Sequence, residues 1–215
     1  VRVIRGSSYG FNWPIAVASD GTHVWVVNQD GNSVTELSTS TGALVRVIRG
    51  SSYGFDVPAA VASDGTHVWV TNQDGNAVTE LSASTGALVN VIRGSSYGFD
   101  EPIAVASNGT HVWVANGGGS VTELSAATGA LIRLIRGSSY GFDQPAGIAL
   151  GGSHVWVTNF AGNAVTELSA STGALVRVIS GSGYAFDAPM GIISDGSHVW
   201  VANERADSVT ELPAS

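Results

Sequence analysis

The sequence contains no cysteine and no lysine among its 215 residues, and only 12% of its residues are charged. Without cysteine there is no disulfide framework and no thiolate metal ligand or nucleophile, so the redox compartment cannot be read from cysteine usage. All nine basic residues are arginines, against ten aspartates and seven glutamates, and the net charge is -8. Nucleic-acid binding needs clustered positive charge, so the composition argues against a nucleic-acid partner.

Long apolar segments are also absent. No run approaches the roughly 20 apolar residues that a membrane-spanning helix needs, and the N-terminus lacks the basic-then-apolar layout of a signal peptide. We therefore expect a soluble chain with no membrane partner, in a compartment that the sequence does not fix. Glycine, in contrast, accounts for 28 residues, nearly twice its usual share of about 7%. Low charge and abundant glycine favour short strands joined by tight turns.

The chain consists of five copies of one unit, spaced by 43 or 44 residues. The phrase His-Val-Trp-Val starts at His23, His67, His111, His154 and His198. The phrase Val-Thr-Glu-Leu recurs with its glutamate at Glu36, Glu80, Glu123, Glu167 and Glu211. Such a period indicates a repeat architecture, and we expect one domain spanning residues 1–215.

Within a unit the apolar residues alternate with a period of two, and turn signals come too often for helices. In the first unit the pattern predicts strands at residues 15–18, 23–27, 33–37 and 44–49. The pair Asp20-Gly21 favours a tight hairpin between the first two. Each unit is thus a four-stranded antiparallel meander. Residues 50–58 are long enough to cross three interstrand gaps of about 4.8 Å and start the next sheet, as a β-propeller requires.

The two ends of the chain predict how the ring closes. Residues 1–6 read as the fourth strand of a unit, whereas the chain stops just after a third strand. Pairing residues 1–5 with residues 208–212 would complete five four-stranded blades without an unpaired edge. We therefore predict an all-β fold, a closed five-bladed β-propeller, as a monomer. The alternative is a five-unit part of a larger ring, which would expose its terminal blades and associate with other copies.

Several phrases carry a family resemblance. Residues 153–159 (Ser-His-Val-Trp-Val-Thr-Asn), residues 162–168 (Gly-Asn-Ala-Val-Thr-Glu-Leu) and then Thr172-Gly173 resemble the bacterial YVTN and NHL classes of β-propeller repeat. The resemblance covers the whole chain. It implies the fold but not one function, because such repeats occur in binding modules, sensor domains and a few lyases. It also leaves an extracytoplasmic location open. The low divergence between units resembles that of recently amplified or engineered propellers.

Three repeated residue types are assigned to the scaffold. The five tryptophans are expected to fill the space between neighbouring sheets: Trp25, Trp69, Trp113, Trp156 and Trp200. The histidines are expected to bind local turns, because copies on separate blades lie too far apart to share one metal ion. The repeated glutamates should face cross-strand partners on the fourth strand, which are Arg46, Arg133, Arg177 and Arg2, with Asn90 in the second unit.

Candidate binding residues lie where the units differ, in loops on one face of the ring. Just before the proline stand Trp13, Val57, Glu101, Gln144 and Ala188. In the turn between second and third strands, Phe160, Glu204 and Arg205 depart from the pattern. An exposed Trp13 or Phe160 beside Glu101, Gln144 and Arg205 would form a mixed apolar and polar patch. Two residues before the proline, a set of carboxylates offers either calcium or magnesium ligands or local Asx turns: Asp56, Asp100, Asp143 and Asp187.

These features predict a binding or display scaffold without enzymatic activity and without a cofactor. Its partner would be a protein or a glycan bound at the variable face. The first alternative is a lectin with one sugar site per blade, built from the Tyr, Phe and Asp of the return loop and favoured by avidity. The second is a metal-assisted lyase, which needs an acid, base or metal constellation in one blade. Only Glu101, Glu204 and Arg205 break the repeat in that way.

Overall fold

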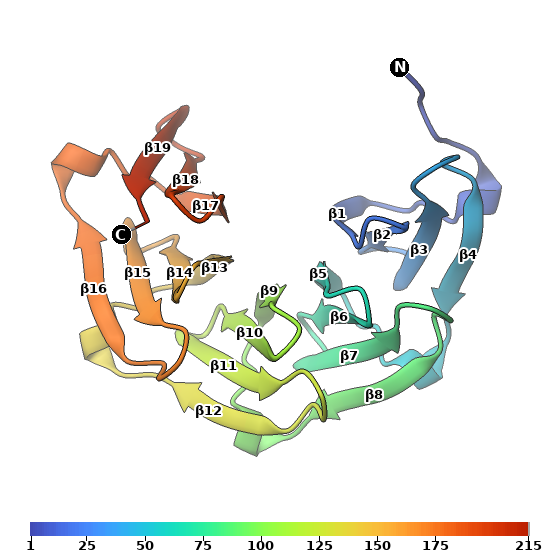
Figure 1. The fold of residues 1–215 in the computed structure, drawn as a ribbon, viewed down its shortest axis with the longest axis horizontal. Helices are drawn as coiled ribbons and strands as arrows, with labels where there is room; N and C mark the ends of the chain where they lie inside the picture. The colour runs from blue at the N-terminus through green and yellow to red at the C-terminus, as the bar shows by residue number, and fades with distance from the viewer. Residues whose placement is uncertain (215) are drawn as a thin grey trace.

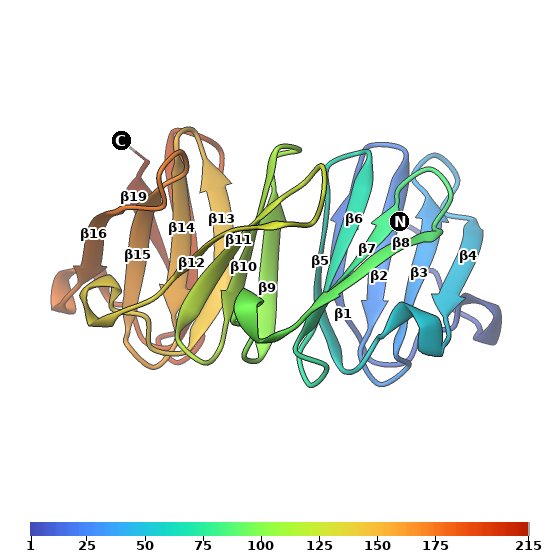
Figure 2. The same cartoon turned by 90° about the horizontal axis from the view of Figure 1, so that it is seen from below.

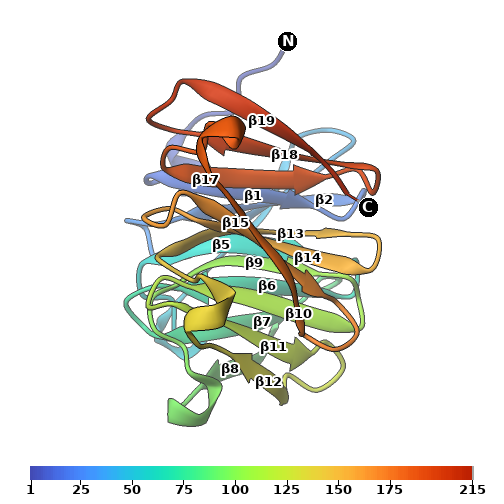
Figure 3. The ribbon, with the colours of Figure 1, turned by 90° about the vertical axis from the view of Figure 1, so that its left-hand side faces the viewer.

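The computed structural model describes residues 1–214 and is built almost entirely of antiparallel sheet. Five sheets stand side by side along an arc, each with its first strand innermost (Figure 1). Their connecting loops lie on two opposite faces of the molecule (Figures 2 and 3). In the described part of the chain the helices are single 3-10 turns, and none has the length or apolar character to cross a membrane.

The strands recur with nearly constant bounds. The innermost strands are β1 (Pro14–Ser19), β5 (Pro58–Ser63), β9 (Pro102–Ser107), β13 (Pro145–Gly151) and β17 (Pro189–Ser194). The second strands are β2 (His23–Asn28), β6 (His67–Asn72), β10 (His111–Asn116), β14 (His154–Asn159) and β18 (His198–Asn203). The third strands are β3 (Ser33–Ser38), β7 (Ala77–Ser82), β11 (Ser120–Ser125), β15 (Ala164–Ser169) and β19 (Ser208–Pro213). The outer strands are β4 (Leu44–Arg49), β8 (Leu88–Arg93), β12 (Leu131–Ile135) and β16 (Leu175–Ser180). The predicted meander is confirmed in the first four repeats.

The connection between repeats contains a short 3-10 helix that the sequence pattern did not predict. The helices are η1 (Ser7–Tyr9), η2 (Ser51–Tyr53), η3 (Ser95–Tyr97), η4 (Ser138–Tyr140) and η5 (Ser182–Tyr184). Each ends on a left-handed residue, which is glycine in the first four repeats and Ala185 in the fifth. Glycine takes that conformation without steric cost. The turn lies between the outer strand of one sheet and the innermost strand of the next.

Neighbouring sheets pack through their repeated apolar residues. Trp25, Val34 and Ile48 of the first repeat form one core cluster with Val61 and Val68 of the second. The same arrangement recurs in three further clusters along the arc. The first four tryptophans are fully buried, which confirms their predicted place between sheets. Each of these four tryptophans is covered by the repeat that follows it, whereas Trp200 of the last repeat is half-buried.

The predicted pairing of residues 1–5 with the last repeat is not formed. The sheet of β17, β18 and β19 has three strands, and residues 1–6 precede η1 outside any sheet that the structure describes. Packing joins β1 to β5, β5 to β9, β9 to β13 and β13 to β17. The arc stays open between β17 and β1 (Figure 1). The structure therefore has five propeller-like sheets but lacks the closed ring, because the sheets do not turn through a full circle.

Candidate binding site at the mouth of the channel

The two variable loops of each repeat are tied together through the backbone. In every repeat the first residue of the turn between second and third strands donates its N–H to the carbonyl of the residue before the proline. The pairs are Gln29 to Trp13 (3.0 Å), Gln73 to Val57 (3.0 Å), Gly117 to Glu101 (2.9 Å), Phe160 to Gln144 (2.9 Å) and Glu204 to Ala188 (3.1 Å). The residues that differ most between repeats are therefore neighbours on one face, as the sequence predicted.

The residue before each proline has a left-handed backbone. The φ angles are 54° at Trp13, 50° at Val57, 54° at Glu101, 52° at Gln144 and 52° at Ala188. This conformation costs a side-chain-bearing residue about 1–2 kcal/mol, and a following proline restricts it further. Such strain persists only where surrounding contacts fix it.

Asparagine side chains from the preceding repeat supply part of that support. Asn32 Oδ1 accepts the N–H of Val57 at 2.9 Å, and Asn76 Oδ1 accepts that of Glu101 at 2.9 Å. Asn163 does the same for the fifth repeat. In the third repeat Gly119 takes the asparagine's place and has no side chain to offer to Gln144. The loops of Val57, Glu101 and Ala188 are thus fixed from the preceding repeat.

Three of the predicted residues meet in one pocket. Glu101, Gln144 and Phe160 line a pocket of about 280 Å³ between the third and fourth repeats, together with Ile103 and Met190. Its remaining wall is formed by Gly117, Pro145 and Ala146. The guanidinium of Arg205 lies 5.2 Å from the centroid of the Phe160 ring, within range of a cation–π contact.

The other predicted residues lie elsewhere. Trp13 is 64% exposed in the first repeat, at the open end of the arc, and does not line this pocket. Ala188 is fully buried, Val57 is half-buried, and Glu204 is exposed outside the pocket. The expected patch is therefore formed by Glu101, Gln144, Phe160 and Arg205 without Trp13.

Comparison of the five repeats with one another did not identify the apolar wall of the pocket. Ile103, Ala146 and Met190 each follow the proline directly. The residues at this position differ between copies, which is the signal that identified the loop residues: Ile15, Ala59, Ile103, Ala146 and Met190. The same comparison, extended by two residues, would have found them.

The pocket adjoins the channel, which is the space on the inner side of the open arc that the innermost strands line. Ile103, Ala146 and Met190 also border a channel volume of about 460 Å³. At the opposite end, serines of the first strands border a volume of about 350 Å³: Ser19, Ser63, Ser107 and Ser194. The variable face is thus the apolar mouth of the channel, and the uniform face is the hydroxyl-lined one.

The repeated glutamates of the first four repeats are buried and belong to the scaffold, whereas Glu211 of the last repeat is exposed. Arg46 Nε lies 2.9 Å from Glu36 Oε2, and His23 Nε2 lies 3.5 Å from Oε1. Burial raises the pKa of Glu36 and outweighs the opposing effects of Arg46 and His23. The predicted arginine partners are confirmed in the first, third and fourth repeats. In the second repeat Glu80 pairs across the sheet with Asn90 instead.

The turn before the histidine is held by an aspartate. Asp20 Oδ1 accepts the N–H groups of Thr22 and His23, and Trp25 Nε1 donates to Oδ2 at 3.4 Å. Burial acts to raise the pKa of Asp20, but these hydrogen bonds outweigh it and the pKa is lowered. In the fifth repeat, hydrogen bonds from the N–H groups of His198 and Ser197 lower the pKa of Asp195 to about 2. The histidines therefore flank structural turns, as predicted.

The aspartates considered as metal ligands are not brought together. Their backbone carbonyls accept loop N–H groups, as in the pairs Gly118 to Asp100 (3.1 Å) and Ala161 to Asp143 (3.2 Å). Asp56 and Asp187 repeat the pattern. Between residues 1 and 214, no three His, Asp or Glu side chains gather as a metal site would require. The carboxylates thus sit one to a loop, and it is the main chain of each that holds the turn.

Comparison with known proteins gives no match to a protein family and no match among curated proteins. Solved structures do match. A catalytically inactive virginiamycin B lyase from Staphylococcus aureus with quinupristin has a TM-score of 0.77 at 19% identity, over 93% of this chain and 66% of that chain. A streptogramin B lyase has a TM-score of 0.70 at 18% identity, over 96% and 70%. A nidogen/laminin complex has a TM-score of 0.75 at 13% identity, over 94% and 76%.

The two lyases contradict one prediction. We expected a chain without enzymatic activity, but its fold is similar to that of enzymes, so the architecture is no argument against catalysis. Identities of 18% and 19% show the fold alone. The chain spans just under two thirds of the length of the first lyase. With its five radially arranged antiparallel sheets, the chain therefore has the β-propeller type of fold.

Proposed function

We propose that the chain is a ligand-binding propeller of the YVTN and NHL type, whose site is the pocket between the third and fourth repeats. The observation that carries this proposal is the convergence of Glu101, Gln144 and Phe160 on one pocket. Scaffold positions repeat from blade to blade, whereas these residues differ from their counterparts. Rigid scaffolds commonly carry their binding groups on such loops, and concave apolar sites with a few polar groups are the usual binding sites.

The chemistry of the wall indicates an amphipathic ligand. Phe160, Ile103 and Met190 offer apolar surface, while the Glu101 carboxylate accepts hydrogen bonds and favours a cation. The pocket of about 280 Å³ is at the small end of ligand sites. It suits a small molecule or an exposed apolar side chain of a protein segment that carries a nearby N–H donor. The nidogen/laminin complex gives an example of a similar fold in a protein complex.

A sugar site in each repeat is less well supported by the geometry. The repeated tyrosine and phenylalanine of the return loop stack on each other, with ring centroids 5.5–5.7 Å apart and planes within 12°. Tyr97 and Phe99 also pack against the core. Aromatic faces engaged in this way leave little surface for a sugar ring, so the lectin alternative becomes one outcome of the test.

The test is a binding titration of the isotope-labelled chain, followed by NMR, with quinupristin, a set of oligosaccharides and laminin as probes. We expect one probe to shift the amide signals of the loops around Gln144 and Phe160. Phe160→Ala should abolish the shift, whereas Trp13→Ala removes a variable aromatic outside the pocket and should leave it unchanged. Binding that survives Phe160→Ala and Glu101→Gln, or a saccharide bound at five equal sites, would contradict the proposal.

A further inference from the structure

The last repeat presents an uncovered apolar face. Val209 is 66% exposed, whereas Val165 at the same position of the fourth repeat is fully buried. Trp200 is half-buried, whereas Trp156 is fully buried. A shallow apolar hollow of about 330 Å³ is lined here by Trp200, Val209 and Ile193 with Gly191, Ile192 and Ala202. In the first four repeats the following sheet covers this surface.

The first repeat presents the complementary face. Val17 is 68% exposed, whereas Val61 at the same position of the second repeat is 8% exposed. Val24 and Val26 are half-buried, although their counterparts in the second repeat are fully buried. These residues form the side of a sheet that packs on the preceding repeat. The two ends are therefore the two halves of an interface that the chain already forms four times.

The strand edge at the last repeat has a matching segment at the N-terminus. Residues 1–5 read Val-Arg-Val-Ile-Arg, as do residues 45–49 of β4. In the first sheet Arg46 pairs opposite the buried Glu36. Glu211 at that position of β19 is 59% exposed, and His198 lies 3.6 Å from it. The same register would place Arg2 opposite Glu211, so the charges match as well as the shapes.

The N-terminal segment occupies, against the first repeat, the place that an outer strand occupies against the repeat after it. Gly86 of the second repeat packs closely on Arg46 of β4, since a Cβ there would lie 2.8 Å from that side chain. Gly42, the equivalent glycine of the first repeat, packs in the same way on the N-terminal segment: a Cβ there would lie 3.1 Å from Ile4 and 3.4 Å from Arg2, and Arg2 donates to the carbonyl of Thr41. Residues 1–5 thus pack against the first repeat in the manner of a preceding blade's outer strand, without that blade's other strands.

The loops match in the same way. Asn32, Asn76 and Asn163 have φ angles of 42–47° and accept the N–H of the pre-proline residue in the following repeat. Asp207 stands at this position in the last repeat, with φ 47°. By analogy, the Asp207 side chain would accept the N–H of Trp13 in a first repeat packed against the last one.

We propose that the chain associates head to tail with a second copy of itself. Residues 1–5 of one copy add the fourth strand to the sheet of β17, β18 and β19 of the next, and the two apolar end faces pack together. The proposal is independent of the ligand pocket and takes the place of the monomer that the sequence predicted. A contact between two different surfaces propagates until a ring closes or a filament forms.

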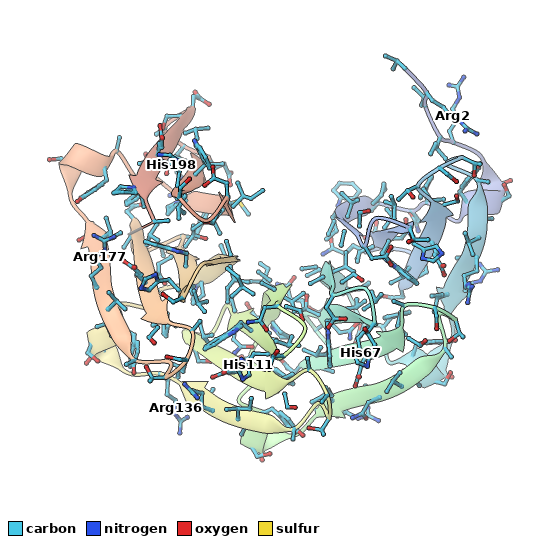
Figure 4. All side chains as sticks on the ribbon, viewed as in Figure 1. Arg2, His67, His111, Arg136, Arg177 and His198 are labelled. Carbon is cyan, nitrogen blue, oxygen red and sulfur yellow. The ribbon has the colours of Figure 1, made fainter. Side chains whose placement is uncertain are left out.

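The curvature of the arc favours a second copy over closure within one chain. Arg2 and His198 lie at opposite ends of the arc (Figure 4). The arc matches the lyase structure over 93% of its own length but covers 66% of that chain, so the same curvature occurs in a longer chain. Closing five sheets on themselves would require all four internal interfaces, with their fully buried tryptophans, to repack.

Sedimentation velocity on the full chain is the first test. We expect a concentration-dependent species of at least twice the monomer mass of 21.9 kDa. Val209→Arg places a charge in the proposed interface and should weaken association by about tenfold or more. The control is Val89→Arg on the outer strand β8, where the valine is 53% exposed and far from both ends, and it should leave association unchanged. A monomer at every concentration would overturn the proposal.

Engineered cysteines identify the contact, since the chain has none of its own. The register of β3 with β4 pairs Val34 with Ile48, so Val209 of one copy should face Ile4 of the next. Mixing a chain carrying Ile4→Cys with one carrying Val209→Cys should give disulfide-linked pairs on oxidation, and Ile4→Cys mixed with Val89→Cys should not. A chain carrying both Ile4→Cys and Val209→Cys that forms an internal disulfide as a monomer would show self-closure and overturn the proposal.

Discussion

Asn90→Arg should stabilise the chain, because it gives the buried carboxylate of Glu80 the partner that other repeats have. Glu80 is 2% exposed and faces Asn90 across the sheet, with His67 Nε2 at 3.6 Å. Burial raises its pKa, and His67 offsets this only in part. In the third repeat, Arg133 Nε lies 2.8 Å from the equivalent Glu123.

The size of the gain follows from the exposure of the two groups. Ion pairs on the surface contribute about 0.2–1 kcal/mol, and hydrogen bonds to charged groups contribute about 1.5–3 kcal/mol. Here the carboxylate is buried while the arginine side chains in equivalent pairs are 28–43% exposed. We therefore expect Asn90→Arg to raise the free energy of unfolding by about 1–2 kcal/mol. For a chain of this length that corresponds to a rise in Tm of about 2–8 °C.

The gain should depend on pH with a definite sign. A carboxyl whose pKa is raised in the folded protein stabilises it fully below the unfolded pKa, near 4.5, and loses that contribution as the pH rises through the folded pKa. A new arginine lowers the folded pKa of Glu80 and reduces this loss. The stability difference between Asn90→Arg and the parent chain should therefore grow as the pH is raised from about 4 to 7.

The assay is urea unfolding at several pH values, at one protein concentration because association would itself raise stability. The matched control is Asn90→Arg combined with Glu80→Gln, which removes the carboxylate and should abolish both the gain and its pH dependence. Equal gains with and without Glu80 would refute the reasoning, since the arginine would then act through packing of its aliphatic stem.

Three further substitutions test local features, each by equilibrium unfolding. In the first repeat Trp25 Nε1 donates to Asp20 Oδ2, whereas the buried Trp113 Nε1 has no hydrogen-bond partner in residues 1–214. Asn108→Asp would supply the equivalent carboxylate oxygen and should raise the free energy of unfolding by about 0.5–1 kcal/mol; no gain would contradict this. Gly98→Ala should destabilise by about 2 kcal/mol or more, because φ is +65° and the new Cβ would lie 2.5 Å from Leu134. Ala185→Gly, at the same position of the fifth repeat with φ 53°, should stabilise by about 0.5–1 kcal/mol; a loss of stability there would count against the backbone explanation.

The strands could be predicted because local pattern determines them. The expected strand at residues 23–27 corresponds to β2, His23–Asn28, and the one at residues 44–49 has the observed bounds of β4. Alternating side chains and turn residues act within a few positions of each other. The 3-10 turns were not predicted, because the alternation of apolar and polar side chains carries no signal for a 3-10 helix.

Ring closure could not be predicted in the same way. It depends on the angle between neighbouring sheets, which the packing of whole faces sets and no short pattern encodes. The sequence of residues 1–5 predicted a strand paired with β19, and the structure does not form that pair. Whether they meet within one chain depends on curvature, and the exposed Val17 and Val209 show that they do not meet here.

The candidate pocket was predicted in part for a related reason. Comparing the repeats identified Glu101, Gln144 and Phe160, because residues outside the scaffold pattern are visible in one sequence. Which of them meet depends on which repeats are neighbours and on where the arc ends. Trp13 belongs to the same set by sequence but lies at the open end, away from the pocket.

The left-handed residues before the prolines have a consequence for how such a chain can diversify. Their backbone is held by main-chain bonds and, in most repeats, by an asparagine of the preceding repeat, so their own side chains take no part in fixing it. Tryptophan, valine, glutamate, glutamine and alanine all occupy this position with φ between 50° and 54°. Ala188 is fully buried, so its loop is constrained by packing, whereas the other four side chains are exposed or half-buried. A library randomised at those four positions would vary recognition while the scaffold, and the cost of its strain, stayed constant.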